Sequence, residues 1–185
     1  MDTRSVTITK FECWPVDIPL TDPFVVATGA RLVAQNVFVR VTLASGAQGY
    51  GEAAPFPEVG GENRESSLTA LQQLGKAILG RSAGDYKEIG RLLFEEAPTH
   101  PAARCGLETA CIDAYCHASD IPMWQFWGAA EVREYETDIT IPICDLRKTL
   151  HLAREWYAKG FRLFKMKVRC CWHAQFCGCR TRMPC

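Results

Sequence analysis

A strand, a helix and a second strand follow one another near the C-terminal end, and this order limits the possible folds more than any other feature. Residues 137–142 are typical of a short strand, and residues 161–168 predict another. Between them, Asp145 is suited to begin a helix and Gly160 to end it. Two strands and a crossover helix within about 30 residues form a βαβ unit with parallel strands. We therefore predict that residues 131–168 begin an α/β region.

The preceding part of the chain predicts a small antiparallel sheet. Residues 6–18 are rich in β-branched and aromatic side chains, as strands are. Residues 37–43 alternate between apolar and polar side chains, which is the period of a half-buried strand. A turn at residues 45–46 and a returning strand over residues 48–53 complete a hairpin.

Two loops and three helices are predicted around this sheet. Residues 19–36 carry few strand signals, and residues 54–61 hold too many Pro and Gly residues for a helix or a central strand. Helical spacing predicts one helix that ends near Gly80 and another over residues 86–96. The third predicted helix carries a stripe of mostly small residues, so we expect another element to pack closely against it. The stripe consists of Ala103, Leu107, Ala110, Cys111, Ala114 and Ala118.

The fold class that follows is α+β: a three-stranded antiparallel sheet with helices over residues 1–130, then the first βαβ unit over residues 131–168. The composition changes abruptly after this point. Residues 1–168 contain 18 Lys and Arg against 21 Asp and Glu, whereas residues 169–185 contain three Arg, no acidic residue and five of the ten cysteines. The spacing of these cysteines fits no zinc-binding pattern. We interpret residues 169–185 as a non-native, Cys- and Arg-rich tail.

The composition as a whole indicates a globular protein of the cytoplasm. Hydrophobic residues make up 48% of the chain, and its formal net charge of zero gives no indication of a nucleic-acid or anionic-membrane partner. No apolar run approaches the roughly 18 residues of a membrane-spanning helix, and residues 1–10 lack the core of a signal peptide. Five cysteines outside the tail lie among apolar residues, which predicts buried free thiols. They are Cys13, Cys105, Cys111, Cys116 and Cys144.

The candidate chemistry lies in the last predicted strand. Side chains alternate across a strand, so Lys165 and Lys167 share one face, and Phe164, Met166 and Val168 share the other. In a parallel barrel the apolar face packs under the helices, and the lysines then point into the barrel. Burial and the mutual repulsion of two ammonium groups both lower a lysine pKa, which lets the amine remove a proton near neutral pH. The lysine motif alone leaves open the solvated face of an edge strand.

The sequence around these lysines resembles the muconate-lactonizing branch of the enolase superfamily, and within it the dipeptide epimerases. The similarity lies first in Thr137-Asp138-Ile139-Thr140 on the first barrel strand and Lys165-Met166-Lys167 on the second. It extends to residues 19–24 (PLTDPF), to residues 49–55 (GYGEAAP) and to the helix around Ala110 and Asp113. The Asp113 carboxylate is expected to bond locally. The resemblance covers the chain from about Val6 to Val168.

The resemblance implies two domains with different functions. Residues 1–130 are implied to form a capping domain, with residues 19–36 and 54–61 as a lid that selects the substrate over a barrel active site. Lys167 is implied to be the base that removes the α-proton of the substrate. Lys165 beside it is implied to keep the pKa of Lys167 low and to contact the substrate carboxylate.

Two further residues are implied to bind the substrate. Thr140 matches the substrate-binding threonine of the family. In some members of the family, an arginine of the first loop binds an acidic second residue of the substrate. Arg31 is the candidate for this arginine. It lies two positions beyond Gly29, which an ungapped match aligns with that arginine.

The implied reaction is epimerisation at the α-carbon of a small dipeptide such as L-Ala-D/L-Glu, so the family activity is that of an isomerase. The resemblance implies Mg²⁺ as the cofactor that stabilises the enolate. Its acidic ligands belong to later barrel strands, and no metal ligand is assigned here because the chain ends 17 residues after Val168. A (β/α)₈ barrel takes about 250 residues. We therefore expect an N-terminal fragment of a metal-dependent dipeptide epimerase, truncated after its second barrel strand and inactive by itself.

Two alternatives are kept. A muconate cycloisomerase or a succinylbenzoate synthase-like enzyme of the same branch shares the two lysines, although Thr140 favours dipeptides. A non-catalytic truncated isoform could instead bind ligand weakly or pair with a full-length partner. A homo-oligomer is possible for the full-length form.

Overall fold

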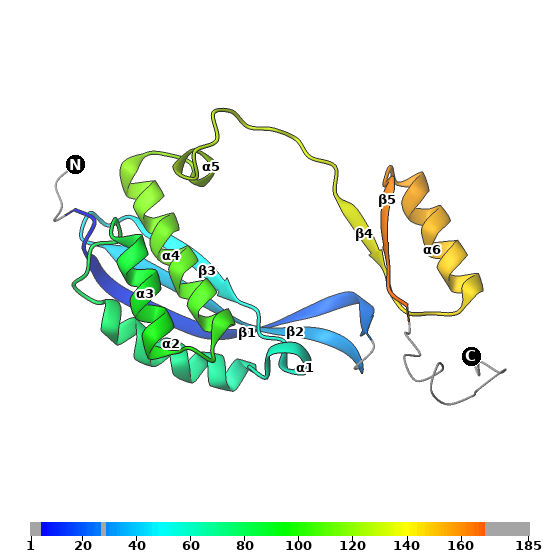
Figure 1. Ribbon diagram of the computed structural model, residues 1–185, viewed down its shortest axis with the longest axis horizontal. Helices are drawn as coiled ribbons and strands as arrows, with labels where there is room; N and C mark the ends of the chain where they lie inside the picture. Colours follow the sequence, from blue (N-terminus) through cyan, green and yellow to red (C-terminus); the bar gives the residue numbers. More distant parts are fainter. Residues whose placement is uncertain (1–4, 27–28, 169–185) are drawn as a thin grey trace. The chain divides into compact units, whose positions relative to one another are not determined.

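The computed structural model describes residues 5–26 and 29–168 (Figure 1). Contacts between residues divide the chain into two compact units. The first unit comprises the residues up to Pro19 and those from Val33 to Val132, and the second comprises Leu20–Leu32 and the residues from Arg133 onward. The predicted domain boundaries at residues 130 and 168 stay predictions, and the predicted tail at residues 169–185 lies outside the described residues.

A three-stranded sheet has the strand order β1 (Ile8–Val26), β2 (Gly29–Leu43) and β3 (Gln48–Ala53), and its residues outside Leu20–Leu32 form one layer of the first unit. Strands β2 and β3 pair antiparallel, with Val39 opposite Gly51. The predicted turn joins them, and Gly46 adopts a φ of 85°, a conformation that glycine reaches without strain. The predicted antiparallel sheet is therefore confirmed.

The loop predicted over residues 19–36 is wrong, because β1 continues to Val26 and β2 already begins at Gly29. The segment carries few strand signals, and two of its residues on β1, Pro19 and Pro23, lack the N–H group that pairs strands. Since β1 lies at the edge of the sheet, a proline that lacks an N–H group is tolerated there.

The segment 54–61 also differs from the prediction. It contains a short helix, α1 (Pro57–Gly60), which begins at a proline. Proline is favoured in the first turn of a helix, where its missing N–H group has no partner to lose.

Three helices pack on one face of the sheet: α2 (Arg64–Ile78), α3 (Tyr86–Glu96) and α4 (Pro101–Ser119). All three were predicted, whereas α5 (Met123–Phe126) was not. Helix α2 begins with a capping box, in which the Asn63 side chain accepts a bond from Ser66 N at 2.8 Å and Ser66 Oγ accepts one from Asn63 N at 3.1 Å.

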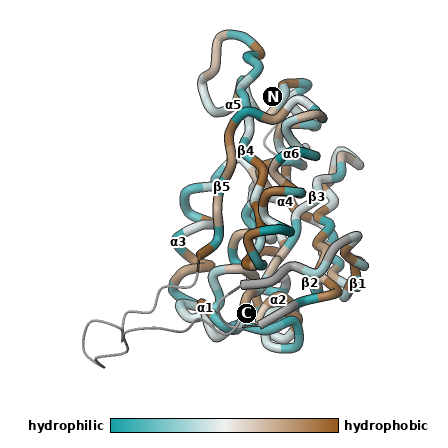
Figure 2. The backbone as a smooth tube through the Cα atoms, turned by 90° about the vertical axis from the view of Figure 1, so that its right-hand side faces the viewer, coloured by the Kyte–Doolittle hydropathy of each residue, from teal (hydrophilic) through white to brown (hydrophobic). Residues whose placement is uncertain are grey.

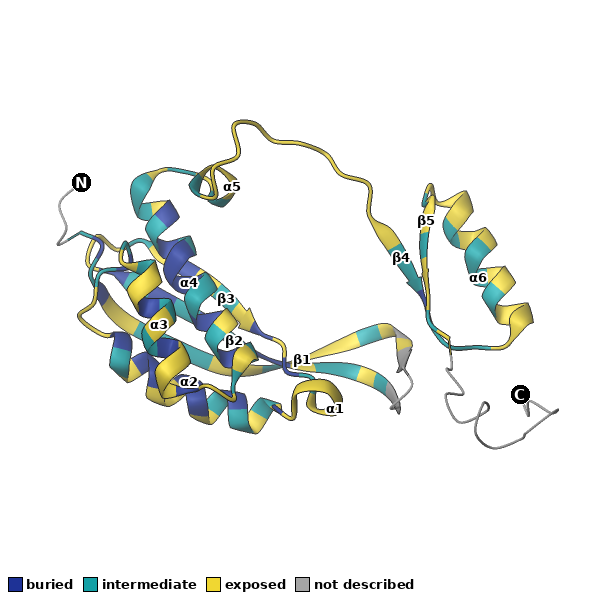
Figure 3. Cartoon of the chain, viewed as in Figure 1, coloured by how far each residue is buried: buried dark blue, intermediate teal, exposed yellow. Residues whose placement is uncertain are grey.

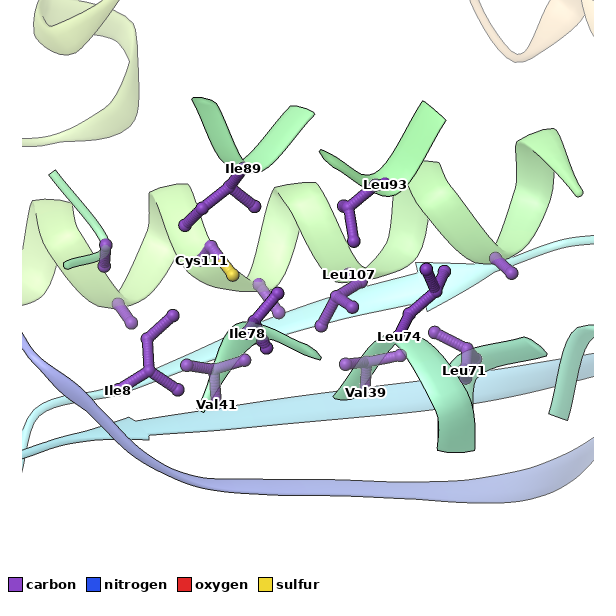
Figure 4. Close-up of a cluster of buried hydrophobic side chains, with 14 of the residues drawn as sticks. Ile8, Val39, Val41, Leu71, Leu74, Ile78, Ile89, Leu93, Leu107 and Cys111 are labelled. Carbon is purple, nitrogen blue, oxygen red and sulfur yellow. The ribbon is translucent and has the colours of Figure 1, made fainter. Parts of the chain in front are cut away.

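The core lies between the sheet and these helices (Figure 4). Alternate residues of β2 point into it, as the period-two pattern predicts, and apolar residues of α2, α3 and α4 meet them. The side chains that are almost fully buried include Val37, Val39, Val41, Leu43, Leu71, Leu74, Ile78, Ile89, Leu93 and Leu107.

Helix α4 packs on β3 at backbone distance. A Cβ atom added at Gly51 would lie 1.9 Å from the carbonyl oxygen of Gly106, and one added at Gly49 would lie 2.1 Å from Ala114 N. The small residues of α4 are therefore needed for its contact with the glycines of β3, which confirms the close packing predicted from the stripe.

A buried carboxylate caps α4. The Glu62 side chain accepts hydrogen bonds from Ala102 N at 2.7 Å, Ala103 N at 3.0 Å and Ser67 Oγ at 2.7 Å. The first N–H groups of a helix have no partner within the helix, and its N-terminus favours a negative charge. Glu62 thus ties the start of α4 to α2.

The second unit contains the predicted βαβ arrangement: β4 (Asp138–Ile141), α6 (Leu146–Ala158) and β5 (Leu163–Met166). The two strands are parallel. Asp145 caps α6 as predicted, because its carboxylate accepts a hydrogen bond from Lys148 N at 2.8 Å. Gly160 follows the helix with a φ of 101°.

Candidate active site

The register of the two parallel strands decides which side chains share a face. Thr140 lies opposite Lys165, and Ile141 lies opposite Met166. In-register partners of neighbouring strands project to the same side of a sheet, and successive residues project to opposite sides. Thr140 and Lys165 therefore share one face of the β4–β5 sheet, and Ile141 and Met166 share the other.

Helix α6 covers the apolar face. Phe164 lines a shallow hollow together with Leu150, Ala153, Arg154 and Tyr157 of α6. Ile141 projects to the same side as Phe164 and is fully buried. Lys165 consequently projects away from α6, on the face that the interior of a (β/α) barrel would use.

Lys167 extends this arrangement by one step beyond β5. Its backbone N–H donates to the carbonyl oxygen of Ile141 at 3.0 Å, so the parallel pairing continues past Met166. By alternation its side chain shares the face of Lys165. The structure thus brings Thr140, Lys165 and Lys167 to one face, and the βαβ prediction on which this placement depends is confirmed.

These side chains are more open to solvent than the sequence suggests. Lys165 is exposed, and Thr140 and Lys167 are half-buried. Within the described residues, β4 and β5 form a sheet of two strands with no third neighbour. Two strands cannot curve into the closed wall of a barrel, so the described part of the chain does not enclose the two amines.

Asp138 also belongs to this face, although no role was predicted for it. It lies two residues before Thr140 on β4 and opposite Leu163, and its side chain is exposed. Alternation along Thr137-Asp138-Ile139-Thr140 could have placed it there, because i and i+2 residues of a strand point the same way.

Arg31 is not part of this face. It lies on β2, the central strand of the three-stranded sheet, and is half-buried. Its predicted contact with a substrate stays a prediction.

The described residues do not fit a Mg²⁺ ion. No group of three or more His, Cys, Asp or Glu side chains among them could hold a metal. The face of Thr140 carries one carboxylate, Asp138, beside two ammonium groups. Mg²⁺ requires a nearly octahedral set of oxygen ligands, and neighbouring cations oppose its binding.

Two expectations elsewhere are corrected. Asp113 bonds beyond its own helix as well as locally: its carboxylate on α4 lies 3.9 Å from His117 Nδ1 of the same helix, and it accepts a hydrogen bond from Tyr50 N at 2.9 Å, on the edge strand β3. Edge strands present unpaired N–H groups, and a side chain from the covering helix satisfies one of them here. Of the cysteines predicted to be buried, Cys111 and Cys116 are buried, Cys13 and Cys144 are half-buried, and Cys105 is exposed.

Residues 8–128 match the model of a protein family described as mandelate racemase / muconate lactonizing enzyme, N-terminal domain. The chain belongs to this family. The predicted muconate-lactonizing branch of the enolase superfamily is confirmed, and so is the predicted α+β fold class. Among the described residues, no helix is both long and apolar enough to cross a membrane.

Similar proteins of this family are epimerases and racemases. An aromatic dipeptide epimerase of Herpetosiphon aurantiacus is 37% identical over 162 residues, which are 88% of this chain and 45% of that protein. An L-Ala-D/L-Glu epimerase of Bacillus subtilis is 30% identical, over 87% of this chain and 44% of that protein. The chain therefore spans less than half the length of these relatives.

Solved structures agree with the fold. The mandelate racemase/muconate lactonizing protein of Herpetosiphon aurantiacus superposes with a TM-score of 0.84 at 36% identity, covering 89% of this chain and 46% of that one. A dipeptide epimerase of Enterococcus faecalis, crystallised with Mg and the dipeptide L-Leu-L-Tyr, gives a TM-score of 0.85 at 26% identity, covering 89% and 44%.

Proposed function

We propose that the face formed by Thr140, Lys165 and Lys167 is one side of a dipeptide epimerase active site, and that the chain carries the capping domain and the first two barrel strands of such an isomerase. The observation that carries the proposal is the common face of these three side chains, opposite the helix that covers the sheet. The dipeptide epimerases among the relatives support the choice of reaction.

Each residue has a distinct role in this proposal. Lys167, as the neutral amine, takes the proton from the α-carbon of the second residue of the dipeptide. The electron pair of the broken C–H bond moves into the adjacent carboxylate and forms an enolate. Lys165 and Thr140 contact that carboxylate, because an ammonium group and a hydroxyl can both donate hydrogen bonds to it. Return of a proton to the opposite side of the carbon inverts the centre.

An enolate formed beside a carboxylate needs strong electrostatic stabilisation. Related epimerases have been crystallised with Mg, but the described residues of this chain do not fit that ion. We therefore propose that residues 5–168 supply one base and part of the substrate contacts, and that they do not catalyse epimerisation without further polypeptide.

Arg31 is proposed to contact an acidic second residue of the substrate. In a complete enzyme that contains residues 1–168, replacing Arg31 with alanine is then expected to slow turnover of L-Ala-L-Glu more than turnover of L-Ala-L-Phe, because only the first offers a side-chain carboxylate for the guanidinium group.

The proposal is tested with a chimera in which residues 1–168 are joined to the part of the Herpetosiphon aurantiacus enzyme that follows its matched region. In D₂O with Mg²⁺, the chimera is expected to exchange the α-proton of at least one of these dipeptides for deuterium. The 185-residue chain alone is expected to exchange none. Exchange by the chain alone, or a folded chimera that exchanges neither dipeptide, contradicts the proposal.

A further inference from the structure

Asp138 adds a carboxylate to the face that carries the two lysines, and no step of the proposed reaction uses it. It lies two residues before Thr140, and its in-register partner on β5 is Leu163. Figure 3 shows that β4 is exposed at its start and buried at its end. Within residues 5–26 and 29–168, the Asp138 side chain makes no hydrogen bond or ion pair. Its carboxylate is therefore free to turn towards a cation on the same face.

The partner directly opposite Asp138 cannot bind its carboxylate. Leu163 is apolar, projects to the same side of the sheet and is 49% exposed. Figure 2 shows short apolar stretches along β4 and β5. The cations described on this face, Lys165 and Lys167, lie two and four residues beyond Leu163. The face therefore offers two candidate partners for this carboxylate.

Distance along the strand separates the two candidates. Neighbouring strands lie about 4.8 Å apart and a strand rises about 3.3 Å per residue, which puts the Cα atom of Asp138 about 8 Å from that of Lys165 and about 14 Å from that of Lys167. An extended lysine and an aspartate together reach about 9 Å from their Cα atoms, and a hydrogen bond adds about 3 Å. Asp138 can therefore meet Lys165 and cannot meet Lys167.

We propose that Asp138 is a positioning residue of the candidate active site, whose carboxylate pairs with the Lys165 ammonium and holds it in place for the substrate carboxylate. The inference deepens the proposed function, on which its substrate side rests. An ammonium group carries three N–H donors, so Lys165 can bind Asp138 with one and keep the others for Thr140 and the substrate. Asp138 acts only through Lys165 and touches no reacting atom.

This pairing makes the two lysines different. A carboxylate within reach favours the charged form of an amine, whereas a neighbouring ammonium group disfavours it. Lys165 has both neighbours, and Lys167 has only the second among the described residues of this face. Asp138 therefore leaves Lys165 as the charged group that meets the substrate, and Lys167 as the amine that can accept a proton.

Trace acetylation with acetic anhydride tests the pair in the 185-residue chain, because an ammonium group must release its proton before it reacts. Asp138→Asn is expected to raise the acetylation rate of Lys165 about twofold to fivefold, which is the range that an exposed ion pair supports. The rate of Lys167 should stay nearly constant, since charges in water that are farther apart than the screening length interact little. No change at Lys165, or an equal change at both lysines, overturns the proposal.

A matched control and a salt series complete this test. Glu136→Gln removes the same charge two residues earlier, from an exposed position before β4 that is farther from Lys165, and should leave both rates unchanged. In the unchanged chain, salt screens the attraction of Asp138 for Lys165, whereas it screens the repulsion between the two lysines equally for both. The ratio of Lys165 to Lys167 acetylation should therefore rise with NaCl concentration. A constant ratio contradicts the pair without any substitution.

The chimera tests the positioning role in turnover. With Mg²⁺ bound, Asp138→Asn is expected to lower kcat/KM for α-proton exchange about tenfold, because a neutral amide no longer holds the ammonium group. Asp138→Glu is expected to keep most of the activity, since its longer carboxylate still reaches Lys165. A purely steric role predicts the reverse order, because asparagine has the shape of aspartate, and that order overturns the proposal.

The two measurements separate this inference from the proposed function. If acetylation reveals the pair but the chimera exchanges no α-proton, the proposed function fails and the pairing of Asp138 with Lys165 stands. If the chimera exchanges α-protons and Asp138→Asn changes neither acetylation nor exchange, the proposed function stands and the positioning role is wrong.

Discussion

Thr140 and Lys165 are in-register partners across the parallel pair of β4 and β5, although the whole of α6 separates them in the sequence. Their common face follows from backbone pairing and does not depend on the conformation of either side chain. The candidate site is therefore only as stable as this pairing, which has one fully buried side chain, Ile141, behind it.

Replacing Ile141 with alanine is expected to disrupt the second unit while sparing the first. Loss of a buried isoleucine costs about 2–5 kcal/mol, and no other buried side chain in residues 133–168 compensates for it. Hydrogen exchange followed by mass spectrometry should show loss of protection in β4 and β5. Protection in residues 37–43 and in α4 should be unchanged, and a parallel loss there would contradict this prediction.

Glu62→Gln is expected to lower the free energy of unfolding of the first unit by about 1–3 kcal/mol, because the charged acceptor of three hydrogen bonds is lost from a buried site. Urea denaturation at pH 7 measures this difference. Glu65→Gln is the control, since Glu65 lies in the first turn of α2 and its side chain is 72% exposed. Its effect should stay below about 0.5 kcal/mol.

Gly51→Ala is expected to destabilise the first unit by about 3 kcal/mol, because the new methyl group would lie 1.9 Å from a backbone oxygen of α4 and must push the helix from the sheet. Thermal unfolding followed by circular dichroism reports this effect. Gly60→Ala meets nothing within 4 Å and should change stability little. Equal stability of the two variants would contradict the backbone contact between α4 and β3.

Cys111 and Cys105 are expected to differ in reactivity towards iodoacetamide. Burial raises the pKa of the Cys111 thiol from its usual 9.0 to about 12, so at pH 8 the native chain holds no appreciable thiolate there. Cys105 is exposed and should be alkylated first, as mass spectrometry can show. Rapid alkylation of Cys111 in the folded chain would contradict its burial.

The raised pKa of Cys111 also makes the stability of the chain depend on pH. Because the pKa of Cys111 is raised on folding, its contribution is fully present below pH 9.0 and declines as the pH rises from there towards about 12. The free energy of unfolding of Cys111→Ala should therefore fall less steeply over this range than that of the unchanged chain.

Elements whose apolar residues recur at a regular spacing could be predicted from sequence. Alternation from Val37 to Leu43 predicted the buried face of β2. The apolar spacing of α2 and the small residues of α4 predicted two helices. The continuation of β1 over residues 19–26 and the start of β2 at Gly29 were missed because strand pairing uses main-chain groups, which carry no sequence signal, and because the edge strand β1 tolerates its prolines.

Part of the candidate site could also be predicted from sequence, and part of the structure around it could not. Alternation within a strand was enough to put Lys165 and Lys167 on one face, and register then added Thr140. Contacts between residues far apart in the sequence could not be predicted from local sequence patterns. Glu62 reaches the start of α4 across 40 residues, and Asp113 reaches Tyr50 across 63. Such contacts depend on how elements pack, which no short window of sequence contains.

Lys167→Ala in the Mg²⁺-loaded chimera tests whether Lys167 is the base, with α-proton exchange of L-Ala-L-Phe and L-Ala-L-Glu in D₂O as the readout. Exchange from one stereoisomer of the substrate is expected to fall at least 100-fold, because the base for that side of the α-carbon is gone. Lys159→Ala is the control: Lys159 caps the C-terminal end of α6 and pairs with Glu155, so this variant should exchange as fast as the unchanged chimera. A Lys167→Ala chimera that exchanges both stereoisomers at the unchanged rate would show that Lys167 is not the base.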